Sequence, residues 1–519
     1  MLVRLFRFLL TAIAVFAVVW IATILWWQSI NRMPTTADIV THLFLLPAGM
    51  IAAYYVIRGA LDGIRTNVSD MRAMRTAPPS DGETPADTAL ADAAANDPTR
   101  RWHAPVLASA VHSTHGPGAV TTLAAMAGQK RPEVGDALHD GKRLYAAPIA
   151  TLDADVDATR AALQRMDADL DWQDEAVRTV ALASDISQRL LTEAFARYPG
   201  LYPMEPVAGT PAVEPIRLVL TLLLPRGTSP AHQTVAAGFV RAQLASLWPA
   251  DRITLEPVAA RGEADTMLLL DRAVTTLNRE PERIVRGLVA ADSLIGAQAV
   301  ASLRYHDRLF GPECPHGVVP GEAAAGVLLA PPLASFAAEI GVDDASMPMR
   351  VGRACVGRLD APADKGVPRT MVLANLIGQT IAQMQPMQPE TSKADGKDSG
   401  DADAQRPEIG AVVADIVPHP VRTLEVARVF SDHFPEHDLS ADLLQVGTAC
   451  GYTAATSALL SVALAHRLAE ERGVPVLAVS AIDAQQRGAL AILPPEPASR
   501  ATDPAANEDV EAPPASAAA

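Results

Sequence analysis

Two stretches of the chain repeat the same order of helix, polar turn and two strands, and this repeat limits the folds available to it. In the first stretch, residues 271–294 show a helical period, a polar turn and a buried strand, and residues 321–332 give a second strand that ends in two prolines. Residues 463–483 and 487–495 follow the same order. The spacing differs because residues 294–316 form a long insertion in the first stretch. Two similar helix–strand–strand units predict an internally duplicated domain.

The rest of the body, residues 102–495, also alternates between strand and helix patterns. Residues 216–224 are a nearly continuous apolar run, which is typical of a strand covered on both faces. Ser229 followed by Pro230 then predicts the start of a helix, because serine caps a helix and proline fits its first position. This alternation predicts helix-covered sheets, and the length fits two coupled α/β units.

Residues 8–27 carry no charge, and an apolar run of this length spans a bilayer as a helix. Trp26 and Trp27 stand at its far end, where an aromatic belt would lie. A cleaved signal peptide is the competing interpretation, but its apolar core is usually shorter and no small-residue cleavage site follows. We therefore expect a retained anchor.

A second uncharged stretch, residues 39–57, contains His42 and Pro47. Arginines precede the first stretch and follow the second, so the positive-inside rule places both ends of the predicted hairpin in the cytoplasm. The body is then cytoplasmic. If residues 39–57 do not span the membrane, the body lies on the periplasmic side instead.

Three segments have compositions that cannot bury enough apolar surface to fold. Residues 76–101 and 388–408 are rich in small, polar and acidic side chains, and the tail from residue 496 is rich in alanine and proline. The chain therefore divides into a transmembrane hairpin (1–60), a juxtamembrane segment and flexible linker (61–101), a first body half (102–345), a second body half (346–495) with a disordered insertion (388–408), and a disordered tail (496–519).

The composition excludes several classes of function. A net charge of −16 argues against a nucleic-acid partner, which needs clustered Lys and Arg. The three cysteines contain no Cys-x-x-Cys pair, so we expect neither a thiolate zinc site nor a disulfide framework. The sequence also lacks a phosphate-binding glycine loop and a Gly-x-Ser-x-Gly elbow. We therefore expect no metal and no cofactor.

Two pairs of segments carry a family resemblance. "VAADSLIGAQAVASLRYHDRLF" (289–310) precedes "GVVPGEAAAGVLLA" (317–330), and "GYTAATSALLSVALA" (451–465) precedes "VPVLAVSAIDAQQRGALAIL" (474–493). These pairs resemble the ends of the two halves of the thiolase-like superfamily, which includes the β-ketoacyl synthases. The resemblance implies an α/β protein with a duplicated five-layer α/β/α/β/α body, here preceded by the transmembrane hairpin. It also implies a homodimer.

The resemblance further implies a nucleophilic cysteine on a turn at the start of a helix in the first half, where the helix dipole favours the thiolate. The corresponding turn here should precede the helix in residues 261–274, and it offers Glu263 and Asp265 in place of cysteine. Neither carboxylate can exchange a thioester, and both would raise the pKa of a neighbouring thiol.

The second half of such proteins supplies a histidine in a Gly-His-Thr turn, and the matching residues here are Gly451, Tyr452 and Thr453. Tyrosine is neutral at physiological pH and cannot replace imidazole as a base. Cys450 imitates the Thr-Ala-Cys nucleophile motif but lies in the wrong half, so we interpret it as a small buried residue. The catalytic positions therefore look empty, and we expect a protein that is not an enzyme.

Other residues leave alternatives open. In the Gly321–Glu322 turn, Glu322 is either a general base or a carboxylate that fixes the turn, and we favour the turn, with the alanines that follow allowing close packing of layers. Asp292 and Ser293 end a buried strand, where functional residues often lie, or they cap the next helix.

Histidines occur at two candidate metal positions. His103, His112 and His115 are either metal ligands or residues at the edge of the core, and no third ligand is evident for the His-x-x-His pair. His433 and His437 stand one helical turn apart, but the proline between them weakens the geometry.

The plan of the whole chain resembles the membrane-anchored adaptor proteins of bacterial type VI secretion, which deliver lipase effectors to the secretion spike protein. The resemblance implies a non-catalytic adaptor in the bacterial inner membrane with a lipase effector and the spike protein as partners. The alternative is a membrane-associated acyl-transfer or condensing enzyme of lipid metabolism that uses Cys450 or Tyr452. A structural membrane scaffold without a ligand is the third interpretation.

Overall fold

The computed structural model describes residues 20, 97–135, 143–202, 214–280, 282–343, 346–362, 367–385 and 407–495. The predicted hairpin (apart from Trp20), the tail and nearly all of both predicted flexible segments lie outside these residues. Within the described ranges, no helix has the length and apolar character needed to cross a membrane.

The first half of the body has five main strands in one sheet. Their order across the sheet is β6-β5-β7-β8-β1. β5 is parallel to both of its neighbours, whereas β8 is antiparallel to both of its own. The bounds of these strands are β1 (His103–Ser113), β5 (Arg217–Leu224), β6 (Ile253–Ala259), β7 (Ile284–Ser293) and β8 (Glu322–Leu329).

The second half repeats this arrangement strand for strand. Its order is β12-β11-β13-β14, with β9 and β10 both paired to β14. β11 is parallel to both neighbours, and β14 is antiparallel to each of its partners. The predicted duplication is therefore present in the topology, and an α/β body with a large mixed sheet is confirmed. The bounds are β9 (Arg350–Gly352), β10 (Cys355–Arg358), β11 (Ala411–Ala414), β12 (Leu443–Gln445), β13 (Val476–Ser480) and β14 (Gln486–Leu493).

β1 and β9 join the two halves. They pair in antiparallel register, with His103 opposite Gly352 and Ala104 opposite Val351, so one continuous sheet runs through both halves. A short strand, β2 (Gly116–Pro117), pairs with β1, whereas β3 (Glu133–Gly135) and β4 (Leu144–Ala146) pair with each other in a separate two-stranded sheet.

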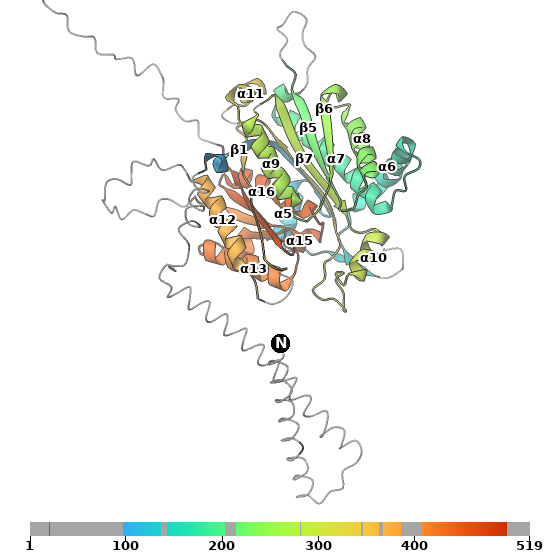
Figure 1. Cartoon of the computed structure of the whole chain (residues 1–519), viewed down its shortest axis with the longest axis vertical. Coiled ribbons are helices and arrows are strands. Elements are labelled where there is room, and N and C mark those ends of the chain that lie inside the picture. Colours follow the sequence, from blue (N-terminus) through green and yellow to red (C-terminus); the bar gives the residue numbers. More distant parts are fainter. Residues whose placement is uncertain are drawn as a thin grey trace, which may run out of the picture. The chain divides into compact units, whose positions relative to one another are not determined.

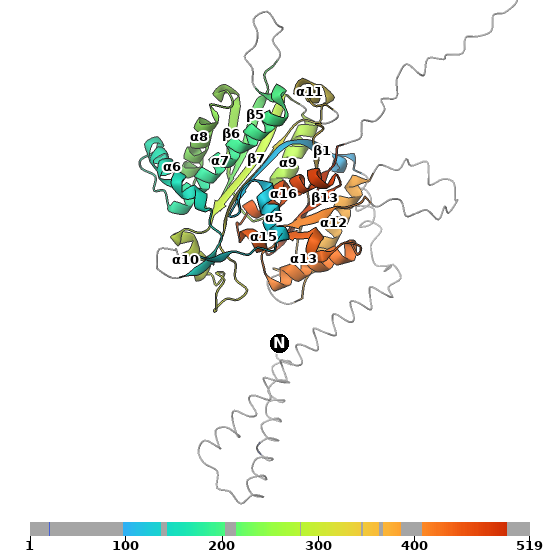
Figure 2. The same cartoon turned by 180° about the vertical axis from the view of Figure 1, so that it is seen from behind.

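The helices form layers inside and outside the sheets (Figures 1 and 2). α9 (Asp265–Arg279) and α16 (Thr456–Arg472) contact both halves of the sheet and share one apolar core with them. α16 is buried nearly all round, as a helix between two sheets must be, and most of its buried residues are apolar. Two further cores lie on the outer faces, beneath α7 (Asp174–Arg197) and α8 (Pro230–Leu244) on one side and α12 (Thr370–Met384) and α13 (Pro420–His433) on the other.

Further helices complete the described body. They are α5 (Ala119–Ala127), α6 (Asp153–Met166), α10 (Ala297–Tyr305), α11 (Ala334–Glu339), α14 (Leu439–Asp442) and α15 (Val446–Cys450), together with four 3-10 helices at Pro98–Arg101, Ala150–Leu152, Pro199–Leu201 and Ala250–Arg252.

Local sequence accounts for the closest packing. Ser229 caps α8 by accepting the His232 N–H at 3.3 Å, as predicted. Every residue of β8 is buried, and three of them are alanines. Ala323 and Ala325 lie in the central core, and Ala324 lies in the core beneath α7. Residues this small let helices approach the strand from both faces, which agrees with the packing role predicted for the alanines.

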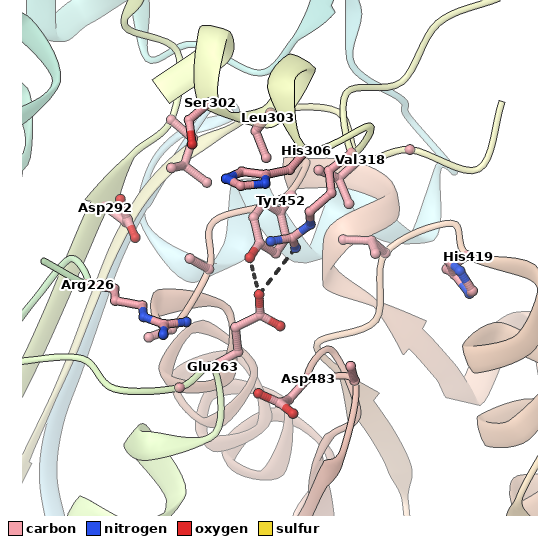
Figure 3. Close-up of a pocket in the computed structure, with 18 of the residues that line it drawn as sticks. Arg226, Glu263, Asp292, Ser302, Leu303, His306, Val318, His419, Tyr452 and Asp483 are labelled. Carbon is pink, nitrogen blue, oxygen red and sulfur yellow. Dashed lines mark hydrogen bonds and ion pairs between the residues drawn. The ribbon is translucent and has the colours of Figure 1, made fainter. Parts of the chain in front are cut away.

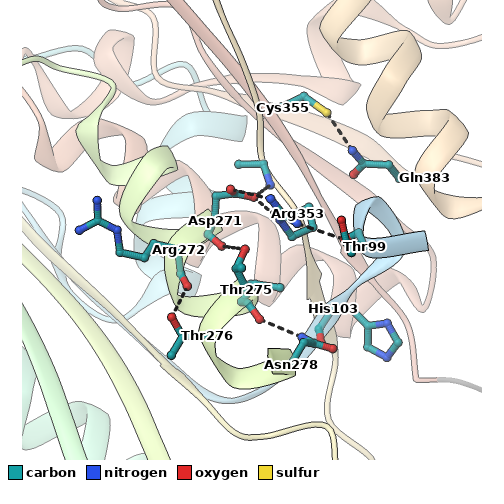
Figure 4. Close-up of polar contacts among 12 residues, drawn as sticks. Thr99, His103, Asp271, Arg272, Thr275, Thr276, Asn278, Arg353, Cys355 and Gln383 are labelled. Atoms are coloured by element: carbon teal, nitrogen blue, oxygen red, sulfur yellow. Dashed lines mark hydrogen bonds and ion pairs between the residues drawn. The ribbon is translucent and has the colours of Figure 1, made fainter. Parts of the chain in front are cut away.

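The start of the body corrects one predicted boundary. The composition predicts a flexible linker up to residue 101, but Pro98–Arg101 forms a 3-10 helix. The Asp97 side chain caps it by accepting the Thr99 N–H at 2.9 Å, and the Arg353 Nη1 donates to the Thr99 carbonyl at 3.1 Å. Arg353 in turn pairs with Asp271 of α9, with 2.9 Å between Nη2 and Oδ2 (Figure 4). This ion pair ties the first residues of the body to both halves, which composition alone does not reveal.

A buried ion pair holds α13 to β14 in the second half. Glu425 and Arg487 have fully buried side chains and form two hydrogen bonds, of 2.8 Å from Nε and 2.9 Å from Nη2. The Arg487 Nη1 donates to the carbonyl oxygens of Asp483 at 2.6 Å and Gln486 at 2.7 Å. The guanidinium therefore has a partner on every side, and its charge depends on Glu425 for compensation.

We expect Glu425→Ala to lower the free energy of unfolding by about 3–5 kcal/mol, because it leaves a buried, unpaired guanidinium. Urea denaturation followed by circular dichroism measures this loss. Glu436→Ala is the matched control, since the Glu436 side chain is 69% exposed, and it should change stability by less than about 0.5 kcal/mol. Equal stabilities of the two variants would contradict the prediction.

Candidate functional site

A cavity of about 1110 Å³ lies at one end of the body. It is bounded by the residues that follow the parallel strands of both halves: Arg226 after β5, Arg261 after β6, His419 after β11 and Asp483 after β13. In α/β sheets, ligands bind outside the carboxyl ends of the strands. The cavity therefore occupies the position where the fold favours a site (Figure 3).

The long insertion of the first half covers this cavity. Leu309 and Val318 form a parallel bridge, and the Val318 N–H donates to the Arg308 carbonyl at 2.6 Å, so residues 308–318 form a closed loop. Gly317 permits this closure, because a Cβ there would lie 2.5 Å from the Leu309 carbonyl carbon. We call residues 302–318 the roof; its cavity-lining members are Ser302, Leu303, His306, Asp307, Arg308, Cys314, His316, Gly317 and Val318.

Two glycine turns, one from each half, meet beneath the roof. The Gly321 N–H donates to the Tyr452 carbonyl at 3.0 Å, and the Tyr452 N–H donates to the Val319 carbonyl at 2.7 Å. A Cβ on Gly321 would lie 2.3 Å from the Cys450 carbonyl oxygen, and Gly451 has a φ of +73°, in the left-handed region. Both turns therefore require glycine, and the structure brings together four of the residues that the sequence singles out.

Glu263, Tyr452 and Arg308 form a polar cluster inside the cavity (Figure 3). The Tyr452 Oη donates to the Glu263 Oε1, and the Arg308 Nη2 lies 3.4 Å from the same oxygen. The Arg308 guanidinium also stands over the Tyr452 ring, 5.0 Å from its centroid. Glu263 comes from the turn before α9 and Tyr452 from the turn before α16, so two residues that the sequence singles out in different halves lie in contact.

Burial sets the protonation of this cluster. It raises the pKa of the Glu263 carboxyl, which the Tyr452 hydrogen bond and the charge of Arg308 partly oppose. Burial, and next the negative charge of Glu263, raise the pKa of Tyr452 far above its usual range. Tyr452 is therefore a hydrogen-bond donor at neutral pH and cannot accept a proton there as a histidine would.

Asp292 also lines the cavity, at the end of β7, and only 3% of its surface is exposed. Burial raises the pKa of its carboxyl to about 7, and the Glu263 charge adds to the effect. The capping alternative for Asp292 and Ser293 is wrong: α10 begins after Gly296, which caps it with no side chain. The Ser293 Oγ instead donates to the Glu322 Oε1 at 2.6 Å.

Glu322 is fully buried and is not one of the residues that line the cavity. Its Oε2 accepts the Ile149 N–H at 2.8 Å and the Arg178 Nη2 at 2.8 Å. Together with the Ser293 hydroxyl, these contacts join β8 to α7 and to the chain before α6. The geometry is that of a carboxylate that fixes a turn.

Cys450 lies beside the site but does not line it, and it is completely buried. Burial raises the pKa of its thiol to about 12, so the thiolate is scarce at neutral pH. Cys314, in the roof, does line the cavity, and its Sγ donates to the Asp307 carbonyl at 3.0 Å. The sequence gives no motif that identifies Cys314, Arg308 or Arg226 as cavity residues.

The histidines have separate partners. The His112 Nδ1 lies 2.8 Å from an Asp185 carboxylate oxygen, and the His115 Nε2 lies 3.0 Å from the Ala449 carbonyl oxygen. His433 is the last residue of α13, and the His437 Nδ1 lies 3.1 Å from Asp442. In the part of the chain that the structure describes, no group of three His, Cys, Asp or Glu side chains could hold a metal ion.

No protein-family model matches the chain, and no curated protein matches it. Solved structures do resemble it. They include the AntDE:AntF complex of a type II PKS acyl-carrier protein with its ketosynthase (11% identity, 76% of this chain and 99% of that chain, TM-score 0.49). The ishigamide ketosynthase/chain length factor has 13% identity and a TM-score of 0.48, covering 76% of this chain and 100% of that chain. Cerulenin-bound OleA of Xanthomonas campestris has 14% identity and a TM-score of 0.39, covering 75% of this chain and 96% of that chain. Identities this low transfer no residue role to this chain.

We expect the raised pKa of Asp292 to make stability depend on pH. The unfolded carboxyl loses its proton near pH 4, so the folded state binds more protons between about pH 4 and pH 7, and the free energy of unfolding falls as pH rises through that window. Asp292→Asn removes this contribution. Its urea midpoint should therefore fall less than that of the wild type between about pH 5 and about pH 8.

Asp415, whose pKa burial raises to about 6, remains in both proteins and cancels in the comparison. Asp432→Asn is the control, since the Asp432 side chain is 69% exposed. If Asp292→Asn and wild type show the same pH dependence, the native Asp292 carboxyl titrates like an exposed one.

Proposed function

We propose that this chain is a non-catalytic adaptor that binds a protein partner, and that its cavity is a former substrate cleft without condensing chemistry. The observation that carries the proposal is the Glu263–Tyr452–Arg308 cluster. It fills the positions at the starts of α9 and α16 where the family resemblance implies a cysteine nucleophile and a histidine.

The chemistry of these groups supports the proposal. A carboxylate cannot carry an acyl group through thioester exchange, and a tyrosine with a raised pKa offers no base near neutral pH. Cys450 and Tyr452 are the candidate nucleophiles of the alternative, an acyl-transfer or condensing enzyme. Complete burial of the Cys450 thiol, with its pKa raised to about 12, disfavours that use.

The resemblance of the whole chain to type VI secretion adaptors suggests the partners. In this proposal, residues 1–60 anchor the chain in the bacterial inner membrane, and the body binds a lipase effector in the cytoplasm for transfer to the spike protein. Affinity purification through a tag on the C-terminal tail, followed by mass spectrometry, tests this. Recovery of a lipase-like effector and a spike protein supports the adaptor; recovery of acyl carrier protein without them contradicts it.

We expect no covalent acyl adduct when the full-length protein is incubated with an acyl thioester of N-acetylcysteamine, because the Cys450 thiol is fully buried and the turn before α9 carries Glu263 in place of a cysteine. Intact-mass spectrometry of wild type, Cys450→Ser and Cys314→Ser measures this. Alkylation of the unfolded protein with iodoacetamide is the control that shows its thiols to be reduced and free. If wild type forms an adduct and Cys450→Ser does not, the adaptor proposal is contradicted and the acyl-transfer enzyme is supported.

A further inference from the structure

Two arginines stand next to each other at the mouth of the cavity. β5 and β6 are parallel neighbours, with Leu224 opposite Ala259, and Arg226 and Arg261 each lie two residues beyond that pair. Both arginines are exposed to solvent, and neither forms an ion pair with another residue of the described ranges. Figure 3 shows the Arg226 side chain extending into the cavity. They are free to bind an anionic group that enters there.

The roof carries an exposed aromatic ring and two imidazoles that line the cavity. Tyr305 ends α10 beside the cavity-lining His306 and is 84% exposed, the largest exposure among the large apolar and aromatic side chains of the described body. His316 lines the cavity from the closed loop of residues 308–318. Exposed tyrosine and arginine side chains are the residue types that most often anchor protein partners.

Four carboxyl groups line the cavity; one of them, Asp307, lies in the roof, and the other three have partners or a raised pKa. The Glu263 carboxylate is hydrogen-bonded to the side chains of Tyr452 and Arg308. The Asp483 Oδ1 accepts hydrogen bonds from two backbone N–H groups, at 2.8 and 2.9 Å. Asp292, with a pKa of about 7, carries only part of a charge at neutral pH. The chain has a net charge of −16, but charges farther than about 8 Å are largely screened at physiological ionic strength. Nearby groups therefore set the potential at the mouth.

The size and position of the cavity suit a segment of polypeptide. Its volume, about 1110 Å³, exceeds the usual range of small-molecule sites, about 300–1,000 Å³. The two ends of the described body lie together at the other end of the sheet, where Arg350 donates to the Pro494 carbonyl at 3.1 Å and lies 3.3 Å from His103. β1 runs from there to the glycine turns at the cavity, a span of roughly 30 Å at about 3.3 Å per residue. The described body therefore begins and ends away from the cavity.

We propose that the cavity mouth is the docking site for an acidic peptide segment of the protein partner, with its carboxylates on Arg226 and Arg261 and an apolar side chain against Tyr305. This inference rests on the proposed adaptor function and names the surface through which the adaptor binds. Arginine pairs carboxylates through two parallel hydrogen bonds, so the two side chains would also fix the register of the segment.

The test uses the full-length chain in a non-ionic detergent and a fluorescein-labelled peptide of alternating glutamate and alanine, with fluorescence anisotropy as the readout. We expect the peptide to bind wild type, to bind less tightly as salt is raised, and to bind Arg226→Glu/Arg261→Glu at least about tenfold more weakly. A lysine–alanine peptide of the same length should bind wild type more weakly than the glutamate–alanine peptide does.

Arg165→Glu/Arg241→Glu is the matched control. It makes the same change in net charge on the outer helices α6 and α8, where each arginine side chain donates only to a backbone carbonyl. Its affinity for the glutamate–alanine peptide should stay within about twofold of wild type. The proposal is overturned if wild type does not bind this peptide, if the lysine peptide binds as tightly, or if both double variants lose affinity equally. Circular dichroism of both variants checks that they fold.

Co-purification separates this inference from the proposed function. If the effector and spike protein co-purify with wild type and with Arg165→Glu/Arg241→Glu but are lost with Arg226→Glu/Arg261→Glu, both proposals are supported. If all three proteins retain them equally, the adaptor function stands and the docking site is wrong. If wild type recovers neither, while acyl carrier protein or an acyl adduct appears, the adaptor function itself fails.

Discussion

The body depends on one backbone contact between its halves, where the Gly321 N–H donates to the Tyr452 carbonyl and the Tyr452 N–H donates to the Val319 carbonyl. The turn at Gly321 leads into β8, and the turn at Gly451 leads into α16. A side chain on Gly321 would collide with the Cys450 carbonyl, so the two turns can come this close only because residue 321 is a glycine. This contact fixes the start of α16 against the first half, and with it the position of Tyr452 over Glu263. The polar cluster, the burial of Cys450 and the shape of the cavity all follow from it.

The sequence predicts the parts of this architecture that obey periodicity. The repeated helix–strand–strand units, the buried strand at 216–224 and the cap at Ser229 are each visible as local patterns, because burial on both faces and capping leave direct traces in composition. The turn residues Gly321 and Gly451 are also visible in the sequence, since a Cβ on Gly321 would collide with the Cys450 carbonyl oxygen and Gly451 has a positive φ. Glu263 and Tyr452 stand out only because a family resemblance supplies an expectation that they fail to meet.

The remainder of the site comes from long-range contacts that leave no local pattern. Arg308 reaches Glu263 across 45 residues of sequence, from an insertion whose composition resembles that of an ordinary loop. Arg226 and Arg261 become neighbours only because β5 and β6 pair in parallel. The start of the body escapes sequence prediction for a similar reason: Pro98–Arg101 has the composition of a linker, but the Thr99 carbonyl within it accepts a hydrogen bond from a guanidinium more than 250 residues away.

The meeting of the two ends of the body at Arg350 has a topological consequence. A short peptide that joined Pro494 to Asp97 would close the described body into a ring without crossing the cavity. New termini could then be opened between the halves, near residues 344–345, where the chain passes from the first half to the second. Such a circular permutant would begin with β9 and end at α11, and each half would still be a continuous stretch of chain, as expected for a protein assembled from two copies of one ancestral unit.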